Sequence, residues 1–300
     1  MNEVAKGIVM TPFNLLYKLS PKTELKVLFK LKTGRRLNLV EPKSFNEKMN
    51  WLKLYDSDLA NQLKPRLCDK YMVREYVQEK MGNSESDILN ELYWEGFNPE
   101  EIPFNRLPKQ FVIKVTHGST FNIIVRDQDE IDRNKIVQKL KLWLSAKFIP
   151  CYGEWWYGIV KPRVIVEKYL ENKDKGELLD YKVFCFNGEP KLIDVHSGRF
   201  GNHKRNVYDT NWNFLKDVNF KYPHSEAIDK PLVLSELLQC AKILSQDFMQ
   251  VRVDFFIVDN KLYFSEFTFA NGAGFDPITP YSFDLKMGSW ISLDKAGYSL

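Results

Sequence analysis

The stretch VRVDFFIVDNKLYFSEFT (residues 251–268) contains two apolar runs, and each run is interrupted by one carboxylate. Two apolar runs on either side of a short polar segment predict a β-hairpin. If Val258 pairs with Leu262 around a three-residue loop, Asp254 lies directly opposite Glu266. A two-residue turn would instead place the two acids on opposite faces, because a shift of one residue reverses every side chain.

The pairing of these two acids decides what they can do. Carboxylates that lie this close repel one another unless a cation or a shared proton joins them. Mg²⁺ is often bound by one or two carboxylates together with substrate phosphates, so the pair predicts a divalent metal site. The alternative is that Asp254 and Glu266 are two separate surface carboxylates.

The rest of the chain predicts an α+β fold with two mainly antiparallel sheets that join near Leu170. Asn187-Gly188 separates two strand-like runs, which is a strong hairpin signal. Apolar residues spaced by three and four predict helices through the first hundred residues, including one over residues 69–81 that ends at Gly82. Further strands are predicted at residues 111–116, 122–126, 163–170, 181–186 and 190–195, and further helices at residues 133–148 and 232–248.

The composition excludes several classes of protein. The 300 residues carry a net charge of +4 and are 44% hydrophobic, which is globular and not disordered. Residues 1–40 hold eight bases and two acids, which favours a local anionic partner over nucleic acid bound across the whole surface. Four widely spaced cysteines argue against a zinc ribbon or a disulfide framework. We expect a cytoplasmic protein, because the sequence contains neither a signal peptide nor a run of about 18 apolar residues.

Several catalytic motifs are missing from the sequence, including the P-loop, the dinucleotide-binding glycine motif, the kinase motifs, GxSxG and HExxH. Asp56-Ser57-Asp58 does match the DxD of metal-dependent glycosyltransferases, which gives an alternative function. It falls in helix-like sequence, however, so a solvated helix end is the other interpretation.

Other residues indicate an anion site. Lys114 lies in an apolar strand that leads into the loop of residues 117–120, and such a lysine either extends to solvent or meets an anion. Together with the backbone N–H groups of that loop it would form a phosphate clamp. The strand of residues 166–170 ends in Glu-Lys and can present backbone groups to a purine edge, while Asp180 and Lys182 share one strand face.

Taken together, seven segments resemble the ATP-grasp superfamily, and closely its TupA-like branch of teichuronopeptide biosynthesis. The segments are KSFNEKMNWLKLYD (43–56), DKYMVREYV (69–77), LPKQFVIKVTHGST (107–120), KPRVIVEKYL (161–170), DYKVFCFNGEPK (180–191), VRVDFF (251–256) and YFSEFTFANGAGF (263–275). The resemblance implies an ATP-grasp fold, in which two α+β subdomains with antiparallel sheets clamp ATP. It implies a helical region over residues 1–66, an N-terminal subdomain with a phosphate-loop lid over 67–170, and a C-terminal subdomain with the metal site over 171–300.

The resemblance also implies contacts with ATP. Lys70 and Lys114 would meet the phosphates, beneath the loop of residues 117–120. Residues 167–170 would form the adenine hinge, and Asp180 with Lys182 would lie near the ribose and phosphates. The residues expected at ATP are Lys70, Lys114, His117, Gly118, Ser119, Thr120, Glu167, Lys168, Tyr169, Leu170, Asp180 and Lys182.

For the metal, the resemblance implies that Asp254 and Glu266 bind Mg²⁺, as two ions, with Mn²⁺ as the alternative. The superfamily usually has Asn two residues after the glutamate, and this chain has Thr268. The third ligand is therefore Thr268, a water or Asn271.

The catalytic side chains implied by the same resemblance are Arg252, which would steady the negative charge on the transferring phosphoryl group or the acyl intermediate, and Lys182. Arg199 would pair with a substrate carboxylate, unless its polar segment is only a solvated loop.

The implied reaction is an ATP-dependent ligation of a carboxylate to an amine through an acyl phosphate. By the same resemblance the carboxylate belongs to a uronic acid of a capsular or cell-wall polysaccharide, and the amine to an amino acid or small amine. Residues 1–40 would hold the acidic glycan or an anionic membrane surface at the inner face of the membrane. Simple helix packing is the alternative for that segment, and a degenerate ATP-binding protein is a third functional class.

Overall fold

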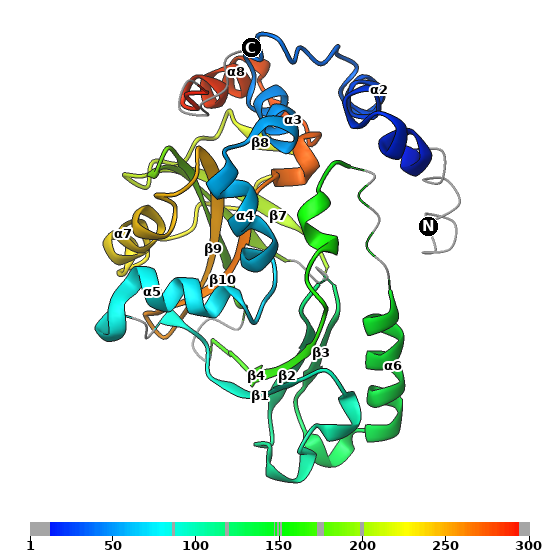
Figure 1. Ribbon diagram of the computed structural model, residues 1–300. Coiled ribbons are helices and arrows are strands. Elements are labelled where there is room, and N and C mark those ends of the chain that lie inside the picture. The colour runs from blue at the N-terminus through cyan, green and yellow to red at the C-terminus, as the bar shows by residue number, and fades with distance from the viewer. Residues whose placement is uncertain are drawn as a thin grey trace.

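Two antiparallel sheets form the centre of the protein, and helices cover them (Figure 1). The computed structural model describes residues 13–85, 88–117, 120–146, 148, 150, 152–172, 177–198 and 201–293. The expected α+β class with two antiparallel sheets is confirmed. The chain passes from the smaller sheet to the larger one between Lys168 and Asp180, close to the predicted joint at Leu170.

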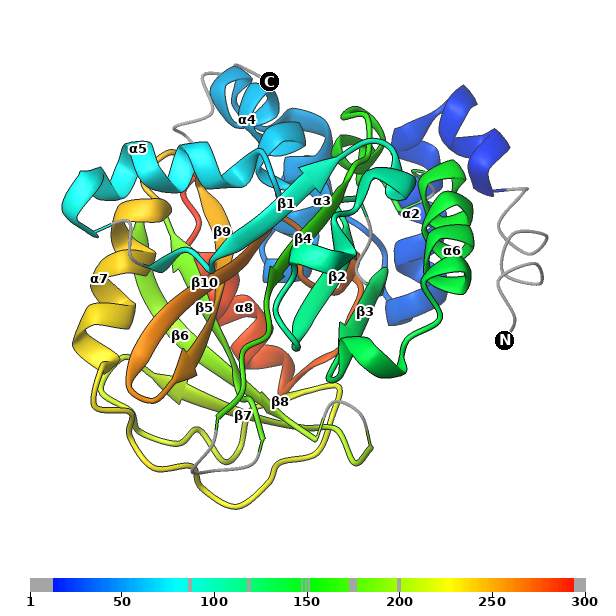
Figure 2. The same ribbon diagram turned by 90° about the horizontal axis from the view of Figure 1, so that it is seen from below.

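The smaller sheet has four strands in the order β1-β4-β2-β3. The strands are β1 (Leu92–Gly96), β2 (Phe111–Val115), β3 (Asn122–Val125) and β4 (Val164–Lys168). Helix α6 (Arg133–Ser145) packs Ile136 and Leu140 against this sheet (Figure 2). Strand β1 was not predicted, because all five of its residues are half-buried and show no alternation.

The larger sheet has five strands in the order β10-β9-β5-β6-β7. They are β5 (Asp180–Phe186), β6 (Glu189–Ser197), β7 (Lys204–Asp209), β9 (Gln250–Val258) and β10 (Lys261–Thr268). The predicted turn at Asn187-Gly188 is confirmed, and both residues have the positive φ that a tight hairpin turn requires. The short strands β8 (Asn219–Phe220) and β11 (Ile278–Thr279) pair beside this sheet.

The two faces of the larger sheet have different partners. Helices α5 (Val73–Glu85) and α7 (Leu234–Leu244) cover one face. On the other face, α3 (Phe45–Tyr55) and α8 (Tyr281–Ser289) pack over Phe184 and Phe186. Further along the same strand, this second face carries Lys182 and Asp180, because side chains two residues apart share a face. It is therefore apolar at one end and polar at the other.

The N-terminal part of the chain is helical, with α2 (Pro21–Thr33) and α4 (Asp58–Leu67) beside α3. The predicted helix start at Asp69 is wrong. The Asp69 carboxylate accepts hydrogen bonds from the N–H groups of Tyr71 and Met72, so these residues form a turn and α5 begins at Val73. Gly82 interrupts α5 with φ of +73°, near the predicted end. Among the described helices, none is long and apolar enough to span a bilayer.

The β9–β10 hairpin differs from its predicted register in an informative way. Val258 pairs with Lys261, so the turn has two residues, both with positive φ, and the predicted three-residue loop is wrong. A β-bulge between Phe264 and Glu266 then adds one residue to β10. Asp254 consequently pairs with Glu266 as predicted, although the turn alone would have separated them.

Candidate active site

Strands of the larger sheet and the loop between β2 and β3 of the smaller sheet line a cavity of about 500 Å³. His117 and Thr120, in the loop after β2, face Arg252 of β9 and Thr268 of β10 across it. We call this cavity the larger compartment. A smaller compartment of about 60 Å³ is lined by Lys114 and Glu167 of the small sheet and by Phe256 and Phe264 of the large one. The two compartments are adjacent, since both are lined by Lys70, Val73, Ser265 and Glu266.

In the smaller compartment, Glu167 is the acceptor for two cations. Lys114 Nζ lies 2.7 Å from its Oε2, and Arg74 Nη1 lies 3.3 Å from its Oε1. Arg74 also donates to the carbonyl oxygen of Asn90 at 2.7 Å. Lys114 therefore meets an anion in this structure, the carboxylate of Glu167, which the sequence did not identify as its partner. The spacing of Arg74 four residues after Lys70 was visible in the sequence, but its partner comes from a distant strand.

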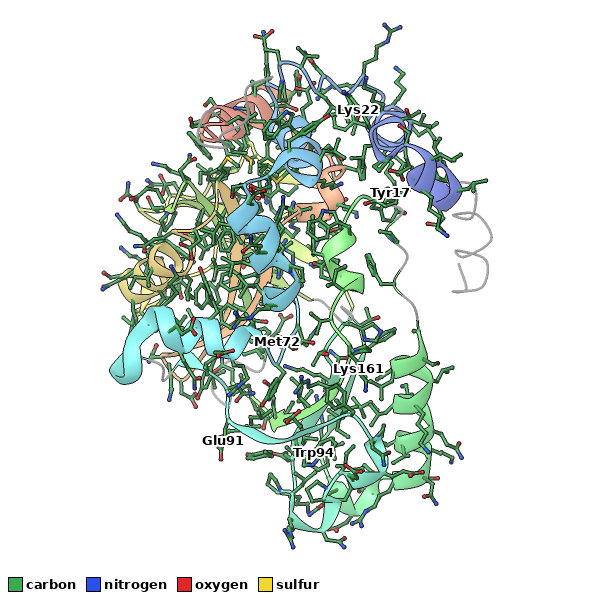
Figure 3. The ribbon with its side chains drawn as sticks, viewed as in Figure 1. Tyr17, Lys22, Met72, Glu91, Trp94 and Lys161 are labelled. Carbon is green, nitrogen blue, oxygen red and sulfur yellow. The ribbon has the colours of Figure 1, made fainter. Side chains whose placement is uncertain are left out.

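The predicted adenine hinge, residues 167–170, spans the end of β4 and the two residues after it. Lys168 N–H donates to the carbonyl oxygen of Glu91 at 2.9 Å, and its own carbonyl accepts from Asn90 Nδ2 at 2.9 Å. Glu91 precedes β1 at the edge of the small sheet (Figure 3). Glu167 and Leu170 line the smaller compartment, so this segment forms one of its walls.

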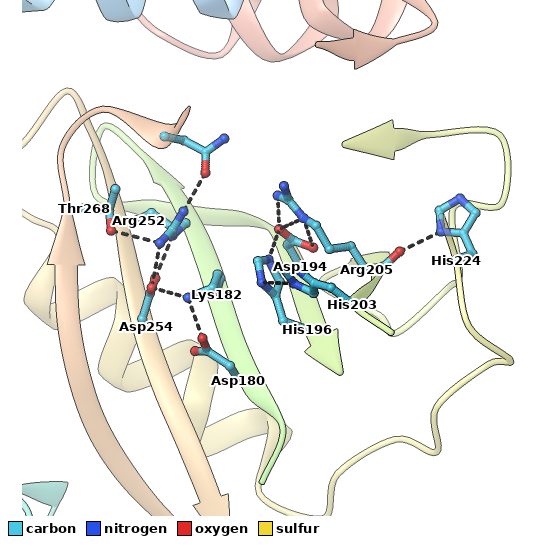
Figure 4. A network of polar contacts seen from close by, with 11 residues as sticks. Asp180, Lys182, Asp194, His196, His203, Arg205, His224, Arg252, Asp254 and Thr268 are labelled. Carbon is cyan, nitrogen blue, oxygen red and sulfur yellow. Dashed lines mark hydrogen bonds and ion pairs between the residues drawn. The ribbon is translucent and has the colours of Figure 1, made fainter. Parts of the chain in front are cut away.

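Arg252 is the centre of the polar cluster on the large sheet (Figure 4). It donates to both oxygens of Asp254 at 2.7 Å and to Thr268 Oγ1 at 2.9 Å. Its Nη1 donates to Asn271 Oδ1. Three of the four residues predicted to bind metal thus surround one guanidinium.

Lys182 completes the neutralisation of Asp254. Its Nζ lies 2.6 Å from Asp254 Oδ2 and 2.7 Å from Asp180 Oδ2, and all three side chains are buried. The sheet register explains the contact, because Lys182 pairs with Asp254 across β5 and β9. Burial alone would raise the pKa of Asp254, but the charges and hydrogen bonds of Arg252 and Lys182 hold it below its ordinary value.

The oxygen donors of this cluster fit Mg²⁺ that arrives with a nucleotide. Glu266 lines both compartments next to Lys70, whose pKa is lowered by burial and raised in part by Glu266. Among the described residues no group of three or more His, Cys, Asp or Glu could hold a metal alone. Mg²⁺ needs only one or two carboxylates when phosphates supply other ligands, and Glu266, which lines both compartments, offers one of them. Asp254 is fully buried and both its oxygens accept hydrogen bonds from Arg252 and Lys182, so it can bind the ion only by exchanging one of these partners.

Three predicted site residues cannot be placed. Gly118, Ser119 and Arg199 lie outside the described residues. Their neighbours His117 and Thr120 line the larger compartment, and His117 Nε2 lies 3.0 Å from the carbonyl oxygen of Ala146.

Helix α3 also holds the loop after β10 in place, which the sequence analysis did not predict. Three of its buried polar side chains bind carbonyl groups in or beside the loop η6 (Asn271–Gly274): Asn46 binds Asp276, Asn50 binds Gly274 and Lys53 binds Ala273. These contacts are 2.7–2.9 Å long and fix the loop that carries Asn271. The spacing 46, 50, 53 is one helix face, so a polar stripe was visible in the segment 43–56.

The Asp56-Ser57-Asp58 motif does not form a metal site in this structure. Asp56 is buried and lies 2.6 Å from Lys64 Nζ, whereas Asp58 is exposed in the first turn of α4. Ser57 caps that helix by accepting from the N–H of Ala60. The motif is therefore explained by a buried ion pair and a helix start.

A second polar network lies beside Lys182 on the same sheet face (Figure 4). Arg205 donates to both oxygens of buried Asp194, and His196 Nε2 lies 2.9 Å from Asp194 Oδ2. His203 Nε2 lies 3.1 Å from His196 Nδ1. Burial lowers the pKa of His196 below its ordinary value, and the charge and hydrogen bond of Asp194 oppose this effect. The sequence signal was Asp194 and His196 at alternate positions of one strand.

Glu24 of α2 is a buried acid whose carboxyl group accepts no hydrogen bond within the described residues. Burial raises the pKa of Glu24 to about 8, and Lys53 partly opposes that shift.

We expect Glu24→Gln to stabilise the protein by roughly 1–3 kcal/mol at about pH 8 and to change little at about pH 4. The folded state binds the Glu24 proton more tightly than the unfolded state. Below the unfolded-state pKa of 4.5, Glu24 is protonated in both states and does not destabilise the folded state. As the pH rises towards 8, the free energy of unfolding falls, because the carboxyl ionises more readily in the unfolded state than in the folded one. Thermal unfolding measured across this pH range tests the prediction, and a difference that does not vary with pH would contradict it.

Comparisons with known proteins identify a family. The family model TupA-like ATPgrasp matches residues 47–292. Comparison with curated proteins gave no match. Among solved structures, the D-alanine–D-alanine ligase from Bacillus anthracis complexed with ATP is 16% identical, with a TM-score of 0.45 over 81% of this chain and 76% of that one.

Two other solved structures show a similar degree of likeness. The L-amino acid ligase from Bacillus licheniformis is 14% identical, with a TM-score of 0.43 over 69% of this chain and 44% of that one. The N5-carboxyaminoimidazole synthase from Aspergillus clavatus, solved with ADP and its ribonucleotide, is 14% identical, with a TM-score of 0.42 over 69% and 46%. The scores are low, so the assignment rests on the family model. Since that model matches most of the chain, this protein belongs to the TupA-like family of ATP-grasp enzymes.

Proposed function

We propose that this protein is an ATP-dependent ligase that joins a carboxylate to an amine. The observation that carries the proposal is the larger compartment, where Arg252 and Lys70 lie beside Glu266 between two antiparallel sheets. A compartment that places two cations beside the Glu266 carboxylate suits a polyphosphate and its metal ion. The family assignment supports the same conclusion.

We assign the nucleotide to both compartments. Lys70 and the loop of residues 117–120 would bind the phosphates, and residues 167–170 would hold the adenine, with Lys114 and Arg74 ordered by Glu167. The subdomains would be residues 67–170 and 171–300, after a helical region over 1–66. Asp180 and Lys182 are buried, so we assign them to holding Asp254 in place.

The proposed reaction has two steps, and the chain contributes charge and alignment to both. Mg²⁺ held by Glu266 and Asp254, with Thr268 or Asn271, would supply further positive charge at the phosphates. In the first step an oxygen of the substrate carboxylate attacks the γ-phosphorus, and ADP leaves. In the second step the amine nitrogen attacks the acyl carbon, and phosphate leaves. Arg252 would stabilise the negative charge of both transition states.

The proposed substrates are an acidic sugar and an amine. A uronic acid of an envelope polysaccharide is the proposed carboxylate, with Arg199 as its partner, and an amino acid or small amine is the acceptor. Lys22, Lys26 and Lys30 are exposed on α2, which supports an acidic glycan or an anionic membrane surface as the ligand of this region.

Release of ADP that requires both a uronic acid and an amine tests the proposed function. We expect Lys114→Ala and Glu266→Gln each to lower this turnover on the order of 10²–10³-fold, because the first removes a cation from the nucleotide site and the second removes a ligand of the metal ion at the phosphates. The matched control is Lys109→Ala, which removes an exposed lysine of the same small-sheet region. Turnover that stays intact in both site variants would contradict the site assignment.

The change in melting temperature on adding each ligand distinguishes the ligase from the alternative function. Stabilisation by ATP with Mg²⁺ supports the ligase, whereas stabilisation by nucleotide sugars would favour a glycosyltransferase.

A further inference from the structure

Glu154 is an acid of the larger compartment that the sequence analysis did not single out. It directly precedes the short helix η5 (Trp155–Gly158) and lines the cavity together with Arg252, Lys70 and Glu266. The compartment therefore contains two acids, which enter it from different elements. Glu266 belongs to the β-hairpin beside the phosphate cations, and Glu154 belongs to the segment before β4.

A fixed lysine neighbours Glu154. Lys53 Nζ donates to Asn50 Oδ1 at 3.0 Å and to the carbonyl oxygen of Ala273 at 2.7 Å, and it lies 4.4 Å from the centre of the Phe275 ring. These contacts hold Lys53 against the loop η6, and its positive charge opposes the increase in pKa that burial causes in two acids, Glu154 and Glu24.

The surroundings set the proton affinity of Glu154. Burial raises its pKa to about 7, and Lys53 opposes the increase. The other titratable groups that influence or share this region are Glu24, Lys53, Cys68, Tyr157 and Glu266. A carboxyl that titrates close to neutrality can both release and accept a proton at neutral pH, which is the property of a general base.

Ligation needs such a base. An aliphatic amine is mostly protonated at neutral pH and has no lone pair with which to attack an acyl carbon. Lys70 and Arg252 are cations, and Glu266 is assigned to the metal ion. His117 is the other candidate in the compartment, but it belongs to the loop that we assign to the phosphates.

We propose that Glu154 binds the acceptor ammonium and is the general base of the ligation step. The inference rests on the proposed function. One ammonium proton passes to a Glu154 carboxylate oxygen, and the nitrogen lone pair forms the C–N bond with the acyl carbon. The bond from that carbon to the phosphate oxygen breaks, and phosphate leaves with the electron pair. The second N–H proton leaves with the phosphate as the amide forms.

The test separates the two steps with two nucleophiles. Glucuronate and ATP–Mg²⁺ are supplied either with hydroxylamine, which is neutral at pH 7 and traps the acyl phosphate as a hydroxamate, or with a panel of amino acids. We expect Glu154→Gln to form hydroxamate within about twofold of the wild-type rate. Its amide formation at pH 7 should fall on the order of 10²–10⁴-fold and recover in part as the pH approaches the pKa of the amine.

Two further variants keep the test sharp. Glu154→Asp retains the carboxylate and should keep a measurable part of the amide rate, which guards against a variant that fails to fold. Glu100→Gln removes an exposed acid and should behave as wild type in both assays.

Three outcomes would overturn the inference. Amide formation by Glu154→Gln at the wild-type rate at pH 7 would show that another group is the base, as would a selective loss of amide formation in His117→Gln alone. Equal loss of hydroxamate and amide in Glu154→Gln would place Glu154 in the phosphoryl step. The proposed function fails separately, and takes the inference with it, if the wild-type protein itself forms no hydroxamate with any uronic acid.

Discussion

Replacing Arg252 with alanine should lower ADP release on the order of 10³-fold while leaving most of the ATP affinity in place. Its guanidinium lines the larger compartment and is the proposed partner of the charge that develops on the transferring phosphoryl group. It also bonds both oxygens of Asp254, which has no solvent-exposed surface. Steady-state kinetics with ATP, a uronic acid and an amine measure the loss.

The matched variant is Arg252→Lys, because it keeps the charge and removes the planar fork. We expect Arg252→Lys to be more stable than Arg252→Ala but to recover little of the turnover. One ammonium cannot reproduce the bonds to Asp254, Thr268 and Asn271 together. Thermal unfolding of both variants separates the two effects. Wild-type turnover in Arg252→Ala would exclude Arg252 from the chemistry.

Asp56→Ala should lower the free energy of unfolding by about 3–5 kcal/mol, because it leaves the Lys64 ammonium buried without its counter-charge. Both side chains are almost completely buried, and the Nζ–Oδ2 distance is 2.6 Å. Burial already lowers the pKa of Lys64, and Asp56 opposes that shift. In the variant the unfolded state binds this proton more tightly than the folded one, so the loss should shrink as the pH rises.

A double variant identifies the cause of that loss. Asp56→Ala with Lys64→Met removes both charges and should recover most of the stability, because an apolar pair of similar volume often replaces a buried ion pair without loss. Chemical denaturation at two pH values provides the measurement. If Asp56→Ala instead abolished binding of Mn²⁺ and left stability unchanged, the DxD motif would be a metal site after all.

The strands and hairpins were largely predictable, because alternation and turn chemistry are local. Asn187-Gly188 gave the β5–β6 hairpin, and the apolar run around Lys114 gave β2. Strand β1 was missed because its residues are evenly half-buried, which leaves no pattern in the sequence. The start of α5 was missed because the Asp69 side chain replaces helical hydrogen bonds with its own.

The sequence singled out Lys114, Glu167 and Arg252 as candidate site residues, but it did not identify the side chains that each of them contacts. Their ion pairs depend on which strands are neighbours and on how far each side chain reaches, and neither is encoded locally. Glu154 was missed for a related reason: nothing beside it in the chain marks it, and its surroundings come from α3, α2 and the loop after β10.

Because of the bulge at Ser265, the β9–β10 hairpin has two different pairing registers. Beyond the bulge, towards the turn, the ladder is set by the tight turn and aligns Phe255 with Phe264 in the hydrophobic core. On the other side the ladder is offset by one residue and aligns Asp254 with Glu266. The core-packing pair Phe255–Phe264 and the acidic pair Asp254–Glu266 therefore follow different registers of one pair of strands. If the ladder set by the turn continued without the bulge, Asp254 would align with Ser265, so the one extra residue is what brings the two acids into register.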